Sequence, residues 1–212
     1  MKKGGNRMDQ TMNTTIPMTN QNNAVIKHGG HEVLDVHSLL GSLIGLQEQY
    51  LMYRTHIQDQ ELLDILDRQK QFLADQYNIM VEAFSTGQDP SKPTGSYNMN
   101  QNNNVIYGMK PSQPKKPIQS INELNDECIS SFMMGLVKAN ASTMTVAALE
   151  ATNPVVRRVI ADSIPNMIEM AYEIFLYQNK KGYYQVPPLP QMDMQQLLNG
   201  FAPAPMGKPP LQ

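Results

Sequence analysis

Four histidines are the residues of this sequence with the clearest potential for metal binding: His28, His31, His37 and His56. His28 and His31 are separated by two glycines, and His37 follows six residues later. A transition-metal site would need carboxylate or thiol ligands that converge with the imidazoles, and the spacing brings none to this segment. We therefore interpret the four histidines as surface residues and expect no metal at them.

Acidic residues suggest a second kind of site, a dinuclear iron or manganese centre inside a helical bundle. Such a centre needs one glutamate from each of two helices and a Glu-x-x-His pair from each of the other two. Glu169 is followed by Tyr172 in the histidine position, and no histidine occurs after His56. Glu48 is the single inward candidate on the first helical stretch. The alternative left open is a metal store or di-metal oxidoreductase with a degenerate site built on Glu48 and Glu169.

The remaining reactive groups have structural explanations. Cys128 is the single cysteine, which excludes an internal disulfide, and its helical apolar stripe indicates a buried, unreactive thiol. Arg157 and Arg158 could hold a phosphate, but Arg158 lies four residues before Asp162 and is expected to pair with it. P-loop, nucleophile-elbow and dinucleotide motifs are missing. We expect no catalytic residue, no cofactor and no enzymatic activity.

Charge and hydropathy exclude further classes of function. The 17 basic and 19 acidic residues are spread along the chain, so no basic stripe is available to bind nucleic acid. No run approaches the roughly 20 consecutive apolar residues that cross a bilayer. The N-terminal lysines lack the apolar run of a signal peptide. The sequence predicts no nucleic-acid partner, no membrane span and no secretory export.

Apolar residues recur at steps of three and four in four stretches, which is the pattern of helices with one buried face. Asp59 and Asn153 stand at N-cap positions of the second and fourth stretches, with Pro154 at the first helical position. Ser120 and Glu123 form a capping box for the third. The expected helices cover residues 33–57, 60–85, 119–150 and 154–181.

These elements predict an all-α fold. Short connections make two antiparallel hairpins, and a linker rich in Pro, Gly and Asn joins them, as in a four-helix ferritin-like bundle with one long crossover. Pro165 is expected to kink the fourth helix without ending it. The predicted parts are a disordered N-terminal arm (1–30), a single bundle (31–190) with its linker (86–118), and a Pro-rich tail (191–212) with a short helix (192–199).

Methionine is abundant, with sixteen residues in the chain. Flexible thioethers suit an irregular interior that holds no metal ligands. We expect the core of the bundle to contain Met133, Met134, Met144, Met167 and Met170.

The end of the fourth stretch, "LYQNKKGYYQVP", has the sequence of residue types that is typical of a helix C-terminus. Lys180 and Lys181 favour the negative end of the helix dipole, and Gly182 can adopt the left-handed conformation that ends a helix. Tyr183 and Tyr184 then follow the cap, and we expect one ring to fold back onto the last turn. A ligand site at the two tyrosines is the alternative.

Three runs of residues carry a resemblance to a known family: "NPVVRRVI", "MIEMAYEIFLYQNKKGYY" and "QVP". With these runs, residues 119–190 resemble the spore coat protein F family of endospore-forming bacteria. The motifs "LLDILDRQ" and "TGQDPS" extend the similarity to about residues 29–190. Members end a two-helix unit with Gly-aromatic-aromatic-Gln-x-Pro, which is matched here by Gly182, Tyr183, Tyr184, Gln185 and Pro187.

The resemblance implies a ferritin-like bundle without a known catalytic site. It implies synthesis in the mother-cell cytoplasm during sporulation and deposition on the spore coat. Other coat proteins, or further copies of the chain, are the implied partners. The family has no established catalytic, cofactor or metal residue to transfer to this sequence.

Overall fold

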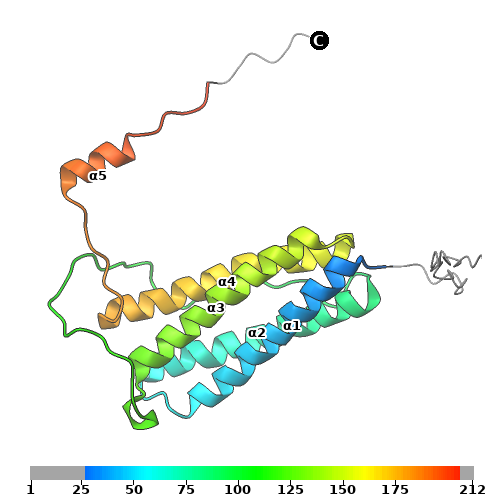
Figure 1. Cartoon of the computed structure of the whole chain (residues 1–212), viewed down its shortest axis with the longest axis horizontal. Helices are drawn as coiled ribbons and strands as arrows, with labels where there is room; N and C mark the ends of the chain where they lie inside the picture. Colours follow the sequence, from blue (N-terminus) through cyan, green and yellow to red (C-terminus); the bar gives the residue numbers. More distant parts are fainter. Residues whose placement is uncertain (1–26, 206–212) are drawn as a thin grey trace, which may run out of the picture.

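A computed structural model describes residues 27–205 of the chain (Figure 1). Within that range the chain is helical, with no extended strands. Its elements are α1 (Gly30–Arg54), α2 (Gln60–Thr86), a 3₁₀ turn (Ile121–Glu123), α3 (Asp126–Glu150), α4 (Pro154–Lys181) and α5 (Gln191–Leu198). Most of the expected N-terminal arm, together with the end of the tail, lies outside the described residues.

The four long helices pack as two hairpins. α3 lies against α4 and α1, and α2 lies against α1 and α4, so each long helix contacts two others. The segment between α2 and α3 contains no α-helix and carries the chain from one hairpin to the other (Figure 1). Each helix therefore buries one face against a shared interior, as its period of three to four residues predicts.

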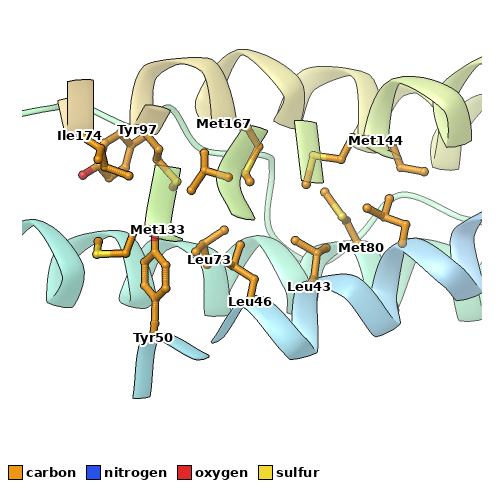
Figure 2. Close-up of a cluster of buried hydrophobic side chains, with 14 of the residues drawn as sticks. Leu43, Leu46, Tyr50, Leu73, Met80, Tyr97, Met133, Met144, Met167 and Ile174 are labelled. Carbon is orange, nitrogen blue, oxygen red and sulfur yellow. The ribbon is translucent and has the colours of Figure 1, made fainter. Parts of the chain in front are cut away.

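Leucine, methionine and tyrosine side chains fill this interior (Figure 2). All five methionines expected there are buried. Tyr97 enters the same cluster from the segment between the hairpins. The buried members labelled in Figure 2 are Leu43, Leu46, Tyr50, Leu73, Met80, Tyr97, Met133, Met144, Met167 and Ile174.

Capping residues set the helix ends where the sequence predicts them. The Asp59 carboxylate accepts a hydrogen bond from the Glu61 backbone N–H at 2.9 Å. Asn153 accepts from the N–H groups of Val155 and Val156 at the start of α4. Gly182 ends α4 with a φ of 78°, a left-handed conformation that costs glycine little.

The predicted start of the third helix is wrong. The Ser120 hydroxyl accepts from the Asn122 N–H at 3.2 Å and caps only the short 3₁₀ turn. Leu124 is extended, which interrupts the helix, and the Asn125 side chain then caps α3 by accepting from the Cys128 N–H at 3.0 Å. Asn125 thus competes successfully with the capping box, because an Asn side chain is as good an N-cap as Ser.

The other predicted boundaries differ by a few residues. α1 begins at Gly30 and ends at Arg54, three residues earlier at each end than expected. α4 continues through Pro165 as one helix, as predicted, and the kink there stays a prediction. α5 forms one residue before the expected 192–199 and has no buried residue.

α3 is the one described helix that is long and apolar enough, by length and composition, to cross a membrane. This differs from the expectation that no segment would qualify. One face of α3 packs against α1 and α4, as in a core helix.

Candidate functional site at the joined ends of the helices

Glu173 of α4 is a fully buried carboxylate in the interior that the di-metal hypothesis would use. It forms an ion pair with Arg68 of α2 and accepts a hydrogen bond from the Tyr97 hydroxyl. The Gln69 side-chain amide donates to its second oxygen at 3.2 Å, and the Asn100 backbone N–H donates at 3.2 Å. The acid is therefore neutralised by a guanidinium and surrounded by donors.

The same network reaches α1 through a tyrosine. The Tyr50 hydroxyl donates to the Gln69 side-chain oxygen at 2.8 Å, and the Gln69 amide also donates to the Met170 carbonyl at 3.1 Å. Burial raises the pKa of the Tyr50 phenol well above its usual range. Burial and the hydrogen bond to Glu173 raise the pKa of Tyr97 in the same direction. Both phenols stay protonated at neutral pH and act as hydrogen-bond donors.

The arrangement of side chains around Glu173 does not fit a metal site. Carboxylate ligands must turn their oxygens toward the ion, but the oxygens of Glu173 face Arg68, Gln69 and Tyr97. Glu48 is exposed and Glu169 is half-buried, so the residues proposed for a degenerate site do not join the network. No group of three or more His, Cys, Asp or Glu side chains within residues 27–205 is arranged to hold a metal ion.

A second buried carboxylate, Glu32 of α1, lies at the opposite end of the helices. It accepts from the backbone N–H groups of Thr152 and Asn153 at 2.6 and 2.8 Å and from the Thr152 hydroxyl at 2.6 Å. His28 lies 2.6 Å from its other oxygen. Burial opposes the charge, but these hydrogen bonds outweigh it and lower the pKa of Glu32. The cluster fastens the start of α1 to the turn between α3 and α4.

The prediction for the histidines is correct for three of them. His31, His37 and His56 are exposed. His28 is the exception, because its side chain is only 17% exposed and its ring packs at 5.4 Å from the Phe84 ring. Its role is to support Glu32.

The last turn of α4 holds other segments through polar side chains that point inward. The Gln178 amide donates to the hydroxyls of Ser130 and Ser131 on α3, both at 3.1 Å. Asn179 accepts from the Ile106 N–H at 2.7 Å and donates to the Ile106 carbonyl at 2.9 Å. Both amide side chains are buried, and periodicity alone would have assigned them to solvent.

The lysines of the same turn contact the start of α2. Lys181 lies 2.5 Å from the Asp59 carboxylate, and Lys180 lies 3.0 Å from that of Glu61. The Tyr177 hydroxyl also donates to Asp59 at 3.1 Å. Burial works against the Asp59 anion, but these partners lower the pKa of Asp59. The lysines therefore tie α4 to α2 in addition to facing the helix dipole.

The two tyrosines after Gly182 pack as predicted for a helix cap. The Tyr183 N–H donates to the Gln178 carbonyl at 2.8 Å, and its ring lies 6.3 Å from that of Tyr177. Tyr184 meets Phe175 edge-on at 5.2 Å. Both rings fold back onto α4, one more than expected.

The residues that follow hold the segment between the hairpins. The Gln185 side chain accepts from the Lys110 N–H, and the Val186 carbonyl accepts from the Gly108 N–H at 2.9 Å. The residues from Gln178 to Val186 therefore join α2, α3 and the segment between the hairpins at one place, which we call the α4 junction.

Two expectations about reactive side chains are wrong. Cys128 is half-buried and lines a groove beside α3, because the buried face of α3 passes through Ile129 and Met133 instead. Arg158 pairs with Asp89, which follows α2, and not with Asp162. The sequence offered no signal for the second contact, because it joins residues 69 positions apart.

Comparison with known proteins identifies a matching domain family and a related sequence. Residues 125–187, which contain α3, α4 and the α4 junction, match the Coat F domain. The chain is 54% identical over 184 residues to the spore coat protein F-like protein YhcQ of Bacillus subtilis (strain 168), with 87% of this chain and 85% of the relative covered.

A similar fold occurs in a crystal structure from Bacillus halodurans C-125 that carries the provisional name of a spore coat protein. The TM-score is 0.55 at 18% identity, over 77% of this chain and 96% of that one. This likeness concerns the helical fold. From the extent and identity of the match to the Bacillus subtilis relative, the chain belongs to the spore coat protein F family.

Proposed function

We propose that the chain is a structural component of the endospore coat that assembles with other coat proteins through its helices and tail, without catalysis. Family membership supports a place in the spore coat. The chain would be synthesised in the mother-cell cytoplasm and deposited on the developing spore.

The observation that carries this proposal is the use of the α4 junction. The five polar side chains from Gln178 to Gln185 each bind another segment of the same chain: Gln178, Asn179, Lys180, Lys181 and Gln185. The residues that characterise the family in this sequence thus hold the fold together. These contacts would make the chain a rigid unit, which suits a protein that assembles with others.

We also propose that residues 31–190 form one domain with a ferritin-like four-helix arrangement. Two hairpins joined by a long crossover support this, as does the contact of each long helix with two neighbours. In such a domain the Arg68–Glu173 pair replaces a metal centre with an internal ion pair.

Fluorescence microscopy of a tagged copy in sporulating Bacillus subtilis tests the proposal. The fusion is expected to appear during sporulation and to form a shell around the forespore, whereas the tag alone stays diffuse. A fusion that remains diffuse in the mother cell would contradict the coat role. Elemental analysis of the purified chain tests the rest: stoichiometric iron or manganese that is lost on Glu48→Ala or Glu169→Ala would contradict a metal-free interior.

A further inference from the structure

The short helix α5 stands away from the packed helices (Figure 1). All four of its apolar side chains are exposed. Leu198 is 73% exposed, and Phe201 just beyond the helix is 93% exposed. Side chains left in water in this way forgo the favourable free energy of burial. A helix of this composition is suited to bury its apolar residues against a partner.

The apolar residues of this segment are arranged to bind a groove. Met194, Leu197, Leu198 and Phe201 follow the spacing i, i+3, i+4 and i+7. The helix ends at Leu198, and one further turn follows in which the Gly200 N–H donates to the Leu197 carbonyl at 3.2 Å, so Phe201 lies just beyond that turn. This spacing is the anchor pattern of amphipathic helices that lie in apolar grooves. We call these four residues the α5 anchors.

A groove of suitable chemistry lies where the segment between the hairpins meets the first turns of α3. Its volume is about 720 Å³. Pro117, Ile118, Cys128 and Phe132 supply its apolar surface, and lysines and glutamates stand at its edge. Phe132, in the second turn of α3, is 43% exposed. We call this cavity the Phe132 groove.

Charge adds to the apolar match. Asp193 is the only charged residue of α5 and lies beside the anchor face. At the edge of the groove, Lys115 is already paired with Glu127 at 2.6 Å. The two remaining charges at the edge, Lys116 and Glu123, are exposed and form no ion pair within residues 27–205, and Lys116 is the one that attracts Asp193.

The connection between α4 and α5 favours docking on another copy. Val186 is fixed to Gly108, and the next four residues are Pro187, Pro188, Leu189 and Pro190. Proline-rich segments are extended and semi-rigid, at about 3.1 Å per residue. This spacer of roughly 12 Å holds α5 outward and opposes its return to the chain's own surface.

We infer that α5 of one copy docks its anchors into the Phe132 groove of a second copy. This inference deepens the proposed assembly role and rests on it. Each copy carries one helix and one groove, so the contact produces either a reciprocal pair or an open chain of copies, depending on whether the rotation between copies closes. An open chain would suit a layer built by repetition.

The single cysteine makes the test direct, because Cys128 already lines the groove. Purified Leu197→Cys/Cys128→Ser protein is mixed with an equal amount of the unmodified chain and oxidised with copper phenanthroline. The docked state places the introduced thiol of one copy near Cys128 of the other. Gln196→Cys/Cys128→Ser is the matched control, because Gln196 lies on the opposite face of α5.

We expect a disulfide-linked heterodimer that forms about tenfold faster with the Leu197→Cys protein than with the Gln196→Cys protein, since docking raises the effective concentration of the two thiols. A Phe132→Asp substitution in the cysteine-bearing copy should abolish the difference. Equal rates for both positions would overturn the inference. So would a Leu197→Cys chain with its native Cys128 that closes the disulfide only within monomers, because α5 would then dock in its own groove.

The localisation experiment separates this inference from the proposed function. A fusion carrying Leu197→Glu and Leu198→Glu that still surrounds the forespore, combined with no specific cross-link, would overturn the copy-to-copy contact and leave the coat role standing. Specific cross-links from a chain that never reaches the forespore would do the reverse.

Discussion

Asn179 and Ile106 exchange two hydrogen bonds, one from the Ile106 N–H to the Asn179 side-chain oxygen at 2.7 Å and one from the Asn179 amide to the Ile106 carbonyl at 2.9 Å. The same amide also donates to the Tyr184 carbonyl at 3.0 Å. The buried Asn179 side chain thus binds the backbone of the segment between the hairpins and the backbone that follows α4. The Asn179 amide binds the N–H and the carbonyl of Ile106, as the backbone of a neighbouring strand would in a sheet.

Replacing Asn179 by Asp tests this arrangement with almost no change of shape. The new oxygen faces the carbonyls of Ile106 and Tyr184, and a buried carboxylate oxygen that faces two acceptors and no donor is costly, so the free energy of unfolding should fall by about 2–3 kcal/mol. Urea denaturation measures the change. Limited proteolysis should show faster cleavage between residues 100 and 118.

Asn103→Asp is the control, because Asn103 is exposed in the same crossing segment. This change should stay within about 0.5 kcal/mol of the unmodified chain. An equal effect of the two substitutions would mean that the Asn179 contacts contribute nothing specific.

The Arg68–Glu173 pair predicts a strong coupling between two helices. Glu173→Gln and Arg68→Met should each lower the free energy of unfolding by about 3 kcal/mol, because each leaves one buried or half-buried charge without its partner. The double variant should lose much less than the sum. Thermal or urea unfolding of the four proteins gives the coupling energy directly.

Glu169→Gln is the matched control for this cycle, one helical turn before Glu173 and half-buried. It should change stability by less than about 0.5 kcal/mol. If the single variants at Arg68 and Glu173 simply add, the ion pair does not stabilise the interior.

The sequence predicts the helices better than it predicts their inward faces. Helical period and capping residues such as Asp59 and Asn153 are local features, and they identify the elements within a few residues. Phe132 and Val146 are apolar residues of α3, yet both are exposed, since the packed face is formed by other residues such as Met133 and Met144 and also holds Asn140. Hydropathy alone does not separate the two sides of a helix that is apolar all round.

The candidate site was predicted only in part, because its polar groups are buried. Gln178, Asn179 and Glu173 look like solvent-facing residues until α3 and the segment between the hairpins supply their partners. Those partners lie far away in the sequence, where no spacing rule relates them. The roles of Gly182 and of the lysines before it could be predicted, since a helix cap depends on neighbours along the chain.

Two glycines offer a test of opposite signs. Gly182 has a φ of 78°, so Gly182→Ala should lower the free energy of unfolding by about 1 kcal/mol. Gly135 lies in the middle of α3, and an added Cβ there meets nothing within 4 Å, so Gly135→Ala should raise it by about 0.5–1 kcal/mol. Calorimetry should show a lower Tm for the first and a higher Tm for the second. A stabilising Gly182→Ala would show that the left-handed cap is not adopted in solution.

The lowered pKa of Glu32 makes part of the stability depend on pH in a defined direction. Its hydrogen bonds favour the charged form in the folded chain, so its contribution is complete above the unfolded pKa of about 4.3 and disappears as the pH falls through the lower folded value.

Glu32→Gln removes this contribution and should cost about 2 kcal/mol at pH 7, because a neutral amide replaces the charged acceptor that binds the N–H groups of Thr152 and Asn153. The difference from the unmodified chain should shrink steadily between pH 5 and pH 2, as Glu32 takes up its proton. Urea unfolding at several pH values measures it, with the exposed Glu48→Gln on the same helix as control. A gap that stays constant down to pH 2 would mean that Glu32 acts by packing and not by its charge.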